Sequence, residues 1–169
     1  LLGSLTLAIP GAPGQFGGFT LTTYDSPFNH SKHLALADVD GDGDLDVAIL
    51  DSNNLSIITN NGDGTLGGAL PGLAFAHHPN GMLFVDVDDD GDLDVAIVSN
   101  VATDPTGLYV ALNDGSGTFT VLPPLALAGN RPMSIAAGDL DGDEDLDFVV
   151  GDKTGEDAFV ALNDGTGTM

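Results

Sequence analysis

Short apolar stretches separated by clusters of glycine, asparagine and aspartate run through most of the chain. The stretches are rich in β-branched residues or alternate with polar residues, which is typical of β-strands. The clearest predicted strands cover residues 47–50, 55–59, 95–99, 108–112, 148–150 and 158–162. No segment carries an apolar stripe at the helical period between capping residues, so we expect almost no helix.

Two motifs recur along the chain in step with each other. An aspartate-rich segment reads DVDGDGDLDVAIL at 38–50, DVDDDGDLDVAIV at 86–98 and DLDGDEDLDFVV at 139–150. A turn motif reads NNGDGTL at 60–66, NDGSGTF at 113–119 and NDGTGTM at 163–169. Their common period of roughly fifty residues is that of propeller blades or similar repeat arrays.

Each repeat is predicted to hold four strands. One precedes the aspartate-rich loop, as at 133–137 in the third copy, one follows that loop, and the other two flank the turn motif. Asparagine and glycine between apolar runs indicate hairpins, because both residues accept the positive φ of tight turns. The runs at 47–50 and 95–98 do not alternate, which favours central strands buried on both faces.

These patterns predict an all-β, β-propeller-type fold of about three four-stranded blades and a partial N-terminal repeat, incomplete as a closed ring. Residues 5–16 align without gaps on residues 108–119, so the N-terminal segment corresponds to the back half of a repeat. We expect one domain over 1–169. It divides into a partial repeat at 1–32 and repeats at 33–80, 81–130 and 131–169, the last without its final strand.

The charge of the chain excludes two classes of partner. Its 26 acidic residues against three basic ones give a net charge of −23, which repels nucleic-acid phosphates and anionic lipid. No apolar run is long enough to span a membrane, so no membrane insertion is expected. A hydrophobic content of 42% argues against disorder, and the absence of cysteine excludes disulfides and thiolate metal sites.

Most of the acidic residues fall within three aspartate-rich loops at 38–46, 86–94 and 139–147. Carboxylates this close together repel one another unless a cation lies among them. Aspartate occupies the first, third, fifth, seventh and ninth positions of every loop, and we expect the seventh to coordinate mainly through its backbone carbonyl. The predicted metal ligands are Asp38, Asp40, Asp42, Asp44, Asp46, Asp86, Asp88, Asp90, Asp92, Asp94, Asp139, Asp141, Asp143, Asp145 and Asp147.

Calcium is the cation that these loops suit best, and about three Ca²⁺ ions are predicted. The loops contain neither histidine nor cysteine, which argues against zinc and copper. A flexible loop offers an irregular oxygen shell, which Ca²⁺ accepts and Mg²⁺ does not. Gly43 and Gly91 at the sixth position permit a sharp turn around an ion. Glu144 replaces this glycine in the third loop, so we expect strain there and the weakest of the three sites.

Together, the D-x-D-G-D-G-x-x-D loops and the NDGxGTF turns resemble the FG-GAP/VCBS repeat family, the integrin-α-like calcium-binding β-propeller repeats. The resemblance implies four-stranded blades in a closed ring of typically about seven, with Ca²⁺ bound between the first two strands of a blade. It also implies mostly extracellular proteins that serve in adhesion, carbohydrate contact or surface structure. Asp89 and Glu144 depart from the family's glycines, and three aspartate-rich loops are too few to close such a ring.

The expected function is that of a calcium-stabilised structural or adhesion module, secreted or at the cell surface. Its expected partners are copies of itself, other extracellular proteins or glycans. Two explanations of the incomplete ring stay open: the chain is a fragment of a larger secreted protein, or copies exchange a strand head to tail and form a filament. The alternative function is a lectin-like, carbohydrate-binding propeller, for which two tyrosines and no tryptophan are a poor supply of stacking side chains.

No catalytic activity is expected. The four histidines, His30, His33, His77 and His78, lie outside the aspartate-rich loops, and no serine stands in a G-x-S-x-G motif. The carboxylates that a glycosidase-type pair would need are already assigned to metal binding. We therefore predict no catalytic residue and no cofactor other than calcium.

Overall fold

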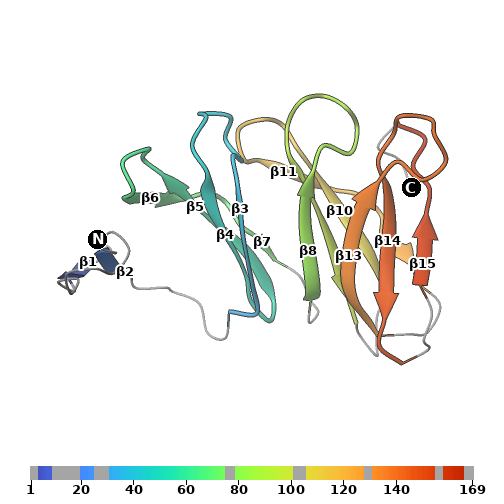
Figure 1. The fold of residues 1–169 in the computed structure, drawn as a ribbon, viewed down its shortest axis with the longest axis horizontal. Coiled ribbons are helices and arrows are strands. Elements are labelled where there is room, and N and C mark those ends of the chain that lie inside the picture. The colour runs from blue at the N-terminus through green and yellow to red at the C-terminus, as the bar shows by residue number, and fades with distance from the viewer. Residues whose placement is uncertain are drawn as a thin grey trace, which may run out of the picture.

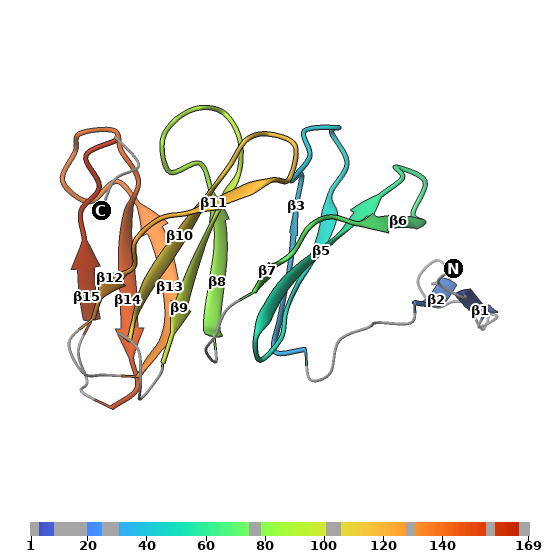
Figure 2. The ribbon, with the colours of Figure 1, turned by 180° about the vertical axis from the view of Figure 1, so that it is seen from behind.

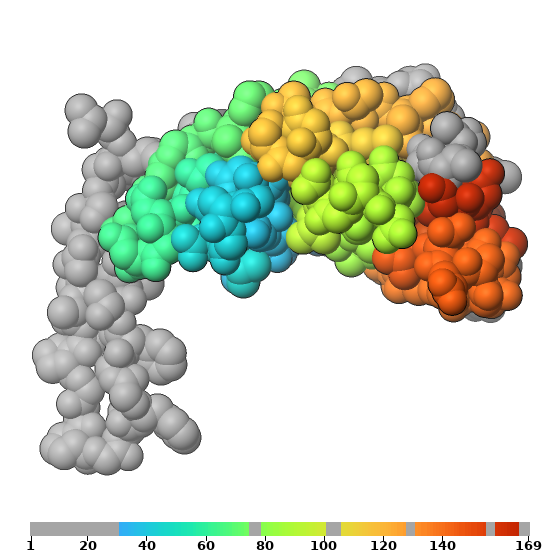
Figure 3. Space-filling view, turned by 90° about the horizontal axis from the view of Figure 1, so that it is seen from above, coloured from blue at the N-terminus to red at the C-terminus, as the bar shows by residue number. Residues whose placement is uncertain are grey.

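The computed structural model describes residues 4–8, 20–24, 31–74, 79–100, 106–127, 131–154 and 158–165. These residues form strands and loops in four antiparallel sheets, with no helix among them. Three of the sheets stand side by side (Figure 1), and seen from above they follow an arc (Figure 3). The fold is therefore all-β, with propeller-type blades that do not close into a ring, as predicted.

The three sheets are called blades, numbered along the chain. Blade one contains β3 (His33–Ala37), β4 (Asp46–Leu50), β5 (Asn54–Asn60), β6 (Leu66–Ala69) and β7 (Leu73–Ala74). Blade two contains β8 (Pro79–Val85), β9 (Asp94–Ser99), β10 (Gly107–Asn113), β11 (Phe119–Val121) and β12 (Leu125–Ala126). Blade three contains β13 (Pro132–Gly138), β14 (Asp147–Asp152) and β15 (Ala158–Ala161), and a separate hairpin pairs β1 (Ser4–Ala8) with β2 (Thr20–Tyr24).

The outermost strand of blades one and two differs from the prediction, because it is divided into two short pieces. In blade one, β6 pairs with the end of β5 and β7 pairs with its beginning (Figure 2). In blade two, β11 and β12 share β10 in the same way. Pro71 lies between the first two pieces, and Pro123 and Pro124 lie between the second two. Since proline has no N–H to donate, it interrupts the ladder at each of these points.

Central strands are buried on both faces, as their non-alternating sequences predict. All six residues of β9 are buried, and in β4 only Val47 is less than fully enclosed. Strand β9 lies between blades one and three, so both of its faces meet apolar side chains, whereas β4 meets another described blade, blade two, on one face. The prediction from the runs at 47–50 and 95–98 is confirmed.

Apolar clusters between the blades form the core. The first contains Ala37, Val39, Ala48, Leu50, Leu55 and Ile57 of blade one with Val95, Ile97 and Ala111 of blade two. The second contains Val87, Ala96, Val98, Leu108, Val110 and Leu127 of blade two with Phe148 and Val150 of blade three. We call the side of a blade that meets the next blade its forward face, and the opposite side its rear face. Burying each large apolar side chain contributes about 1.5–3 kcal/mol, so stability arises mainly between blades.

No helix in the described part of the chain has the length and apolar character needed to cross a membrane.

Candidate metal centres

All three aspartate-rich loops lie at the same end of the blades, together with the turn motifs. Each loop joins the first two strands of its blade: β3 to β4, β8 to β9, and β13 to β14 (Figure 1). The turns that join β5 to β6 and β10 to β11 reach the same end. A Cβ added to Gly41, in the first loop, would lie 3.3 Å from the carbonyl oxygen of Gly115, in the second turn. The loop of one blade therefore touches the turn of the next.

Each loop brings three of its predicted ligands together. The carboxylate groups contribute oxygen atoms that all lie within 4.8 Å of one another. The three sets are Asp38, Asp40 and Asp42; Asp86, Asp88 and Asp90; and Asp139, Asp141 and Asp147. Oxygen clusters of this kind supply the hard ligands that Ca²⁺ prefers.

Two carboxylate oxygens in these clusters have no partner among the described residues. They are Oδ1 of Asp38 and Oδ1 of Asp88, and both atoms are buried. A buried oxygen without a hydrogen bond carries a desolvation cost, which a bound cation would remove. The residues present therefore fit a hard divalent cation.

Carboxylates at the start of each loop also hold its backbone in a curl. Oδ2 of Asp38 accepts a hydrogen bond from the Gly43 backbone N–H at 3.0 Å, and Oδ2 of Asp86 accepts the equivalent bond from Gly91 at 2.9 Å. In the third loop Oδ2 of Asp139 is 3.3 Å from the backbone nitrogen at the same position. The other oxygens of Asp86 and Asp139 accept further bonds, from the Asp90 N–H at 3.1 Å and the Gly142 N–H at 2.7 Å, so the first aspartate fixes the curl of its loop.

Left-handed backbone at the sixth position explains the glycine there. Gly43 has φ +92° and Gly91 has φ +95°, whereas Glu144 is held at φ +78°. The strain predicted for the third loop is therefore present, since a residue with a Cβ disfavours this region. Asp89, at the fourth position of the second loop, also has positive φ, +57°. That its site is the weakest of the three stays a prediction.

The aspartate at the ninth position joins the loop to the turn motif. Asp46 is fully buried; its Oδ2 accepts from the Val39 backbone N–H at 3.0 Å, and its Oδ1 accepts from the Asn60 backbone N–H at 2.9 Å. Asp94 and Asp147 make the same pair of bonds in blades two and three. The structure thus gives these three residues a positioning role; Asp147 also contributes an oxygen to the third cluster, and metal binding by all three stays a prediction.

The aspartate at the seventh position lies against the glycine of the turn motif in its own blade. A Cβ on Gly115 would lie 2.5 Å from Oδ2 of Asp92, and one on Gly165 would lie 2.6 Å from Oδ1 of Asp145. Asp44 contacts Gly62 in the same manner. A side chain on any of these glycines would displace the carboxylate beside it, so the two motifs are in direct contact within each blade. Coordination through the backbone carbonyl at this position remains a prediction.

Crowding raises the pKa of several loop aspartates above the usual value. For Asp40 the causes are desolvation and repulsion from Asp46 and Asp42; for Asp88 they are desolvation and repulsion from Asp90 and Asp86. The pKa values of Asp94, Asp141 and Asp145 are raised as well, in each case first by desolvation. Without a cation, the folded loops hold their charge at a cost in free energy.

Sequence reasoning missed the part played by the first asparagine of the turn motif. Nδ2 of Asn113 donates to the Val39 carbonyl of blade one at 2.8 Å, and Nδ2 of Asn163 donates to the Val87 carbonyl of blade two at 2.8 Å. Each bond joins a blade to the aspartate-rich loop of the preceding blade. The recurrence of asparagine at the start of all three turns was the available signal.

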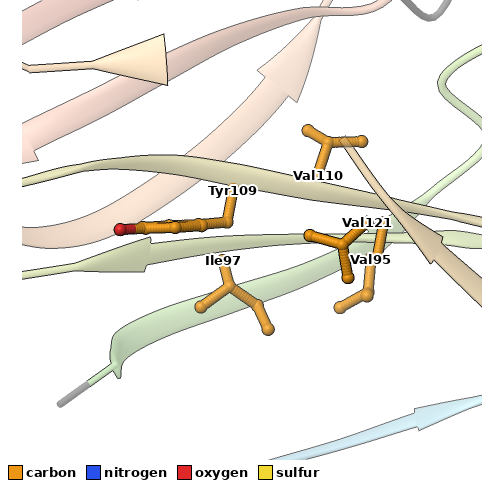
Figure 4. A pocket seen from close by; sticks show the side chains of 6 residues that line it. Val95, Ile97, Tyr109, Val110 and Val121 are labelled. Atoms are coloured by element: carbon orange, nitrogen blue, oxygen red, sulfur yellow. The ribbon is translucent and has the colours of Figure 1, made fainter. Parts of the chain in front are cut away.

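Of the four histidines predicted to have no chemical role, the structure describes one, and His33 is not among the residues of these clusters. His33 begins β3, and His30, His77 and His78 lie outside the described residues. The described residues do hold a small apolar hollow, lined by Val95, Ile97, Tyr109, Val110, Ala111 and Val121 (Figure 4).

Comparisons with known proteins support the repeat assignment. Comparison with curated proteins gave no significant match. One similar solved structure is that of an Agrocybe aegerita lectin, described as the basis of its specific recognition of non-reducing terminal N-acetylglucosamine. The match has a TM-score of 0.57 and 27% identity, and covers 80% of this chain but 36% of the lectin chain. The model of the FG-GAP-like repeat matches residues 38–97 and 86–150, which is more than half of the sequence, and the chain therefore belongs to the FG-GAP-like repeat family.

Proposed function

We propose that this chain is a non-catalytic, calcium-stabilised propeller module that serves outside the cell in structure or adhesion. The observation that carries the proposal is the pair of buried, unpartnered oxygens on Asp38 and Asp88, each within a cluster of three carboxylates. Ca²⁺ in the first two loops would satisfy these oxygens, and three ions, one per loop, would lower the net charge of −23.

The cation would act as a cross-link within each loop. It draws together carboxylates that otherwise repel, so it binds the folded loop far better than the unfolded chain. A ligand at about 10 times its dissociation constant stabilises the folded state by about 1.4 kcal/mol per site. Extracellular sites with dissociation constants of about 10⁻⁴ to 10⁻³ M fill because the ion is abundant there. An extracellular location also agrees with the family, whose members are mostly extracellular.

Chelation tests the proposal. Thermal unfolding is followed by circular dichroism in Ca²⁺, in excess EGTA, and in EGTA with Mg²⁺. We expect EGTA to lower the melting temperature and Ca²⁺ to restore it better than Mg²⁺ does. Asp88→Asn should reduce the calcium-dependent shift, whereas Asp63→Asn should preserve it, because the exposed Asp63 lies in a turn outside the loops. A melting temperature that is the same in EGTA and in Ca²⁺ would show that the loops are solvated turns.

Carbohydrate binding is the second candidate, and the lectin similarity favours it. The hollow in Figure 4 does not add support, since five of its six lining residues are aliphatic and the Tyr109 ring extends away from Val110 and Val121. Sugar sites need several converging polar groups beside an apolar surface. Retention of any sugar on a glycan array, with terminal N-acetylglucosamine included, would favour this function over a purely structural one.

The chain spans about a third of the length of the lectin that it resembles, as the 36% coverage shows. A place within a larger secreted protein and the association of separate copies both follow from this as proposals. Strand exchange after the third turn motif involves residues 166–169, which lie outside the described residues. Exchange of that strand therefore stays a prediction.

A further inference from the structure

Large exposed apolar side chains gather on the two end faces of the array. On the forward face of blade three, Leu140 is 51% exposed and Val160 is 58% exposed, although the equivalent residues of the other blades are buried. Val87 occupies the position of Leu140 and is 4% exposed; Val110 occupies that of Val160 and is 1% exposed. In blade two these positions are covered by blade three. Leu162, directly after β15, is exposed as well.

The rear face of blade one shows the complementary pattern. Leu34 and Leu36 of β3 are 69% and 63% exposed. They pair with β4 as Met82 and Phe84 pair with β9 in blade two, and those two residues pack against blade one. Leu45 is also exposed on this side, at the loop position where the leucine of blade two packs against blade one. Each end face therefore has the composition of one half of the interface between blades.

Polar groups also continue to both ends. A chain of hydrogen bonds runs from Asp46 to the Val39 N–H and from the Val39 carbonyl to Asn113. It passes from Asn113 to Asp94, and then repeats the same steps into blade three, where Asp147 accepts from the Leu140 N–H. In both internal interfaces an asparagine Nδ2 donates to the carbonyl at the second loop position. The corresponding carbonyl at the forward end belongs to Leu140.

The matching donor at the other end of the array belongs to Asn60. Its Nδ2 donates to the Leu45 carbonyl of its own loop at 3.2 Å, as Asn113 also does to Leu93. Asn113 makes a second donation, to the preceding blade, and the Asn60 amide carries the second N–H required for the same bond. The two ends thus carry the donor and the acceptor of the bond found inside the array.

We propose that the forward face of blade three is a docking surface for the rear face of blade one in a second copy of this chain. The contact repeats the interface between blades one and two, with Leu34, Leu36 and Leu45 against Leu140 and Val160. Asn60 of one copy donates to the Leu140 carbonyl of the other. The interface is heterologous, so copies add head to tail. The inference rests on the propeller-type module proposed above but not on the cation.

The test is sedimentation velocity of the whole chain over a range of micromolar concentrations in millimolar Ca²⁺. We expect the mass of the wild type to rise with concentration. Leu36→Asp and Leu140→Asp each remove one half of the interface, and each should weaken association on the order of tenfold or more. Val121→Asp is the matched control, because Val121 is 49% exposed on the outer strand of blade two, away from both ends; its association should match the wild type.

Mixing the two end variants distinguishes this surface from other modes of association. Leu36→Asp retains its forward face and Leu140→Asp retains its rear face, so an equimolar mixture should form dimers and nothing larger. A mixture that remains monomeric overturns the proposal. A wild type that is monomeric at every concentration also overturns it, and would assign the two faces to contacts with further blades of a longer chain. The calcium dependence of the melting temperature, measured on the same samples, tests the metal-binding proposal separately. Either proposal can therefore fail while the other holds.

Discussion

Replacing Asn113 with alanine should weaken the interface between blades one and two and lower the free energy of unfolding. The side chain is 5% exposed and makes three hydrogen bonds. Its Nδ2 donates to the Val39 carbonyl at 2.8 Å and to the Leu93 carbonyl at 3.2 Å, and its Oδ1 accepts from the Gly117 N–H at 3.0 Å. Alanine removes all three bonds and leaves two buried groups, the Val39 carbonyl and the Gly117 N–H, without these partners.

The expected cost follows from those contacts. A buried group that loses its partner costs about 1–3 kcal/mol, so Asn113→Ala should lower the free energy of unfolding by roughly 2–4 kcal/mol. Asn60→Ala is the matched control. Within the described residues the Asn60 side chain bonds to its own blade: it donates to the Leu45 carbonyl at 3.2 Å and accepts from the Gly62 N–H, and both bonds are exposed to water. Its replacement should cost about 1 kcal/mol or less.

Urea unfolding in saturating Ca²⁺, at a protein concentration where copies do not associate, measures both costs. With a slope of about 2 kcal/mol/M, the midpoint for Asn113→Ala should fall by at least about 1 M. The transition should also broaden, because repeat arrays depend on the interfaces between neighbours for their cooperativity. Equal midpoint shifts for the two variants would refute the inter-blade role of Asn113.

Three further outcomes follow from the loops. Glu144→Gly removes the backbone strain of a left-handed residue at φ +78°. Even after the entropic cost of glycine, the melting temperature should rise by about 2–4 °C, and the calcium affinity of the third loop should increase. A lower melting temperature would contradict the strain. In the turn motifs, Gly64→Ala and Gly115→Ala both place alanine at positive φ, but of these two glycines Gly115 alone lies against a carboxylate. Urea unfolding should show a cost of roughly 1 kcal/mol for Gly64→Ala and at least about 2 kcal/mol for Gly115→Ala. Equal costs would refute the steric argument. Because desolvation and neighbouring carboxylates raise the pKa of Asp88, its ionisation destabilises the metal-free protein as the pH rises through that pKa. Asp88→Asn should therefore be more stable than wild type in EGTA at pH 7 and less stable than wild type in Ca²⁺. The difference in stability measured in EGTA should vanish at a pH well below the usual pKa of 3.8. A variant that is less stable than wild type in both solutions would contradict the direction of this effect.

Local chemistry made much of the fold predictable. The strands at β4, β5, β9, β10, β14 and β15 lie where short apolar runs predict them. The sharp turns lie where glycine and asparagine predict them, because positive φ is a property of single residues. The division of the outer strand into β6 and β7 was not predicted, although the proline at position 71 was a local signal for it.

The repeat, the strand order and the concentration of carboxylates in three loops were determined by the sequence itself, since each depends on neighbours along the chain. Tertiary structure decided which carboxylates meet. It turned Asp46, Asp94 and Asp147 toward backbone N–H groups, and it joined Asn113 to Val39 across 74 residues. Such contacts depend on how one blade packs on another, and packing is set by the shape of two assembled faces rather than by the order of residues in either.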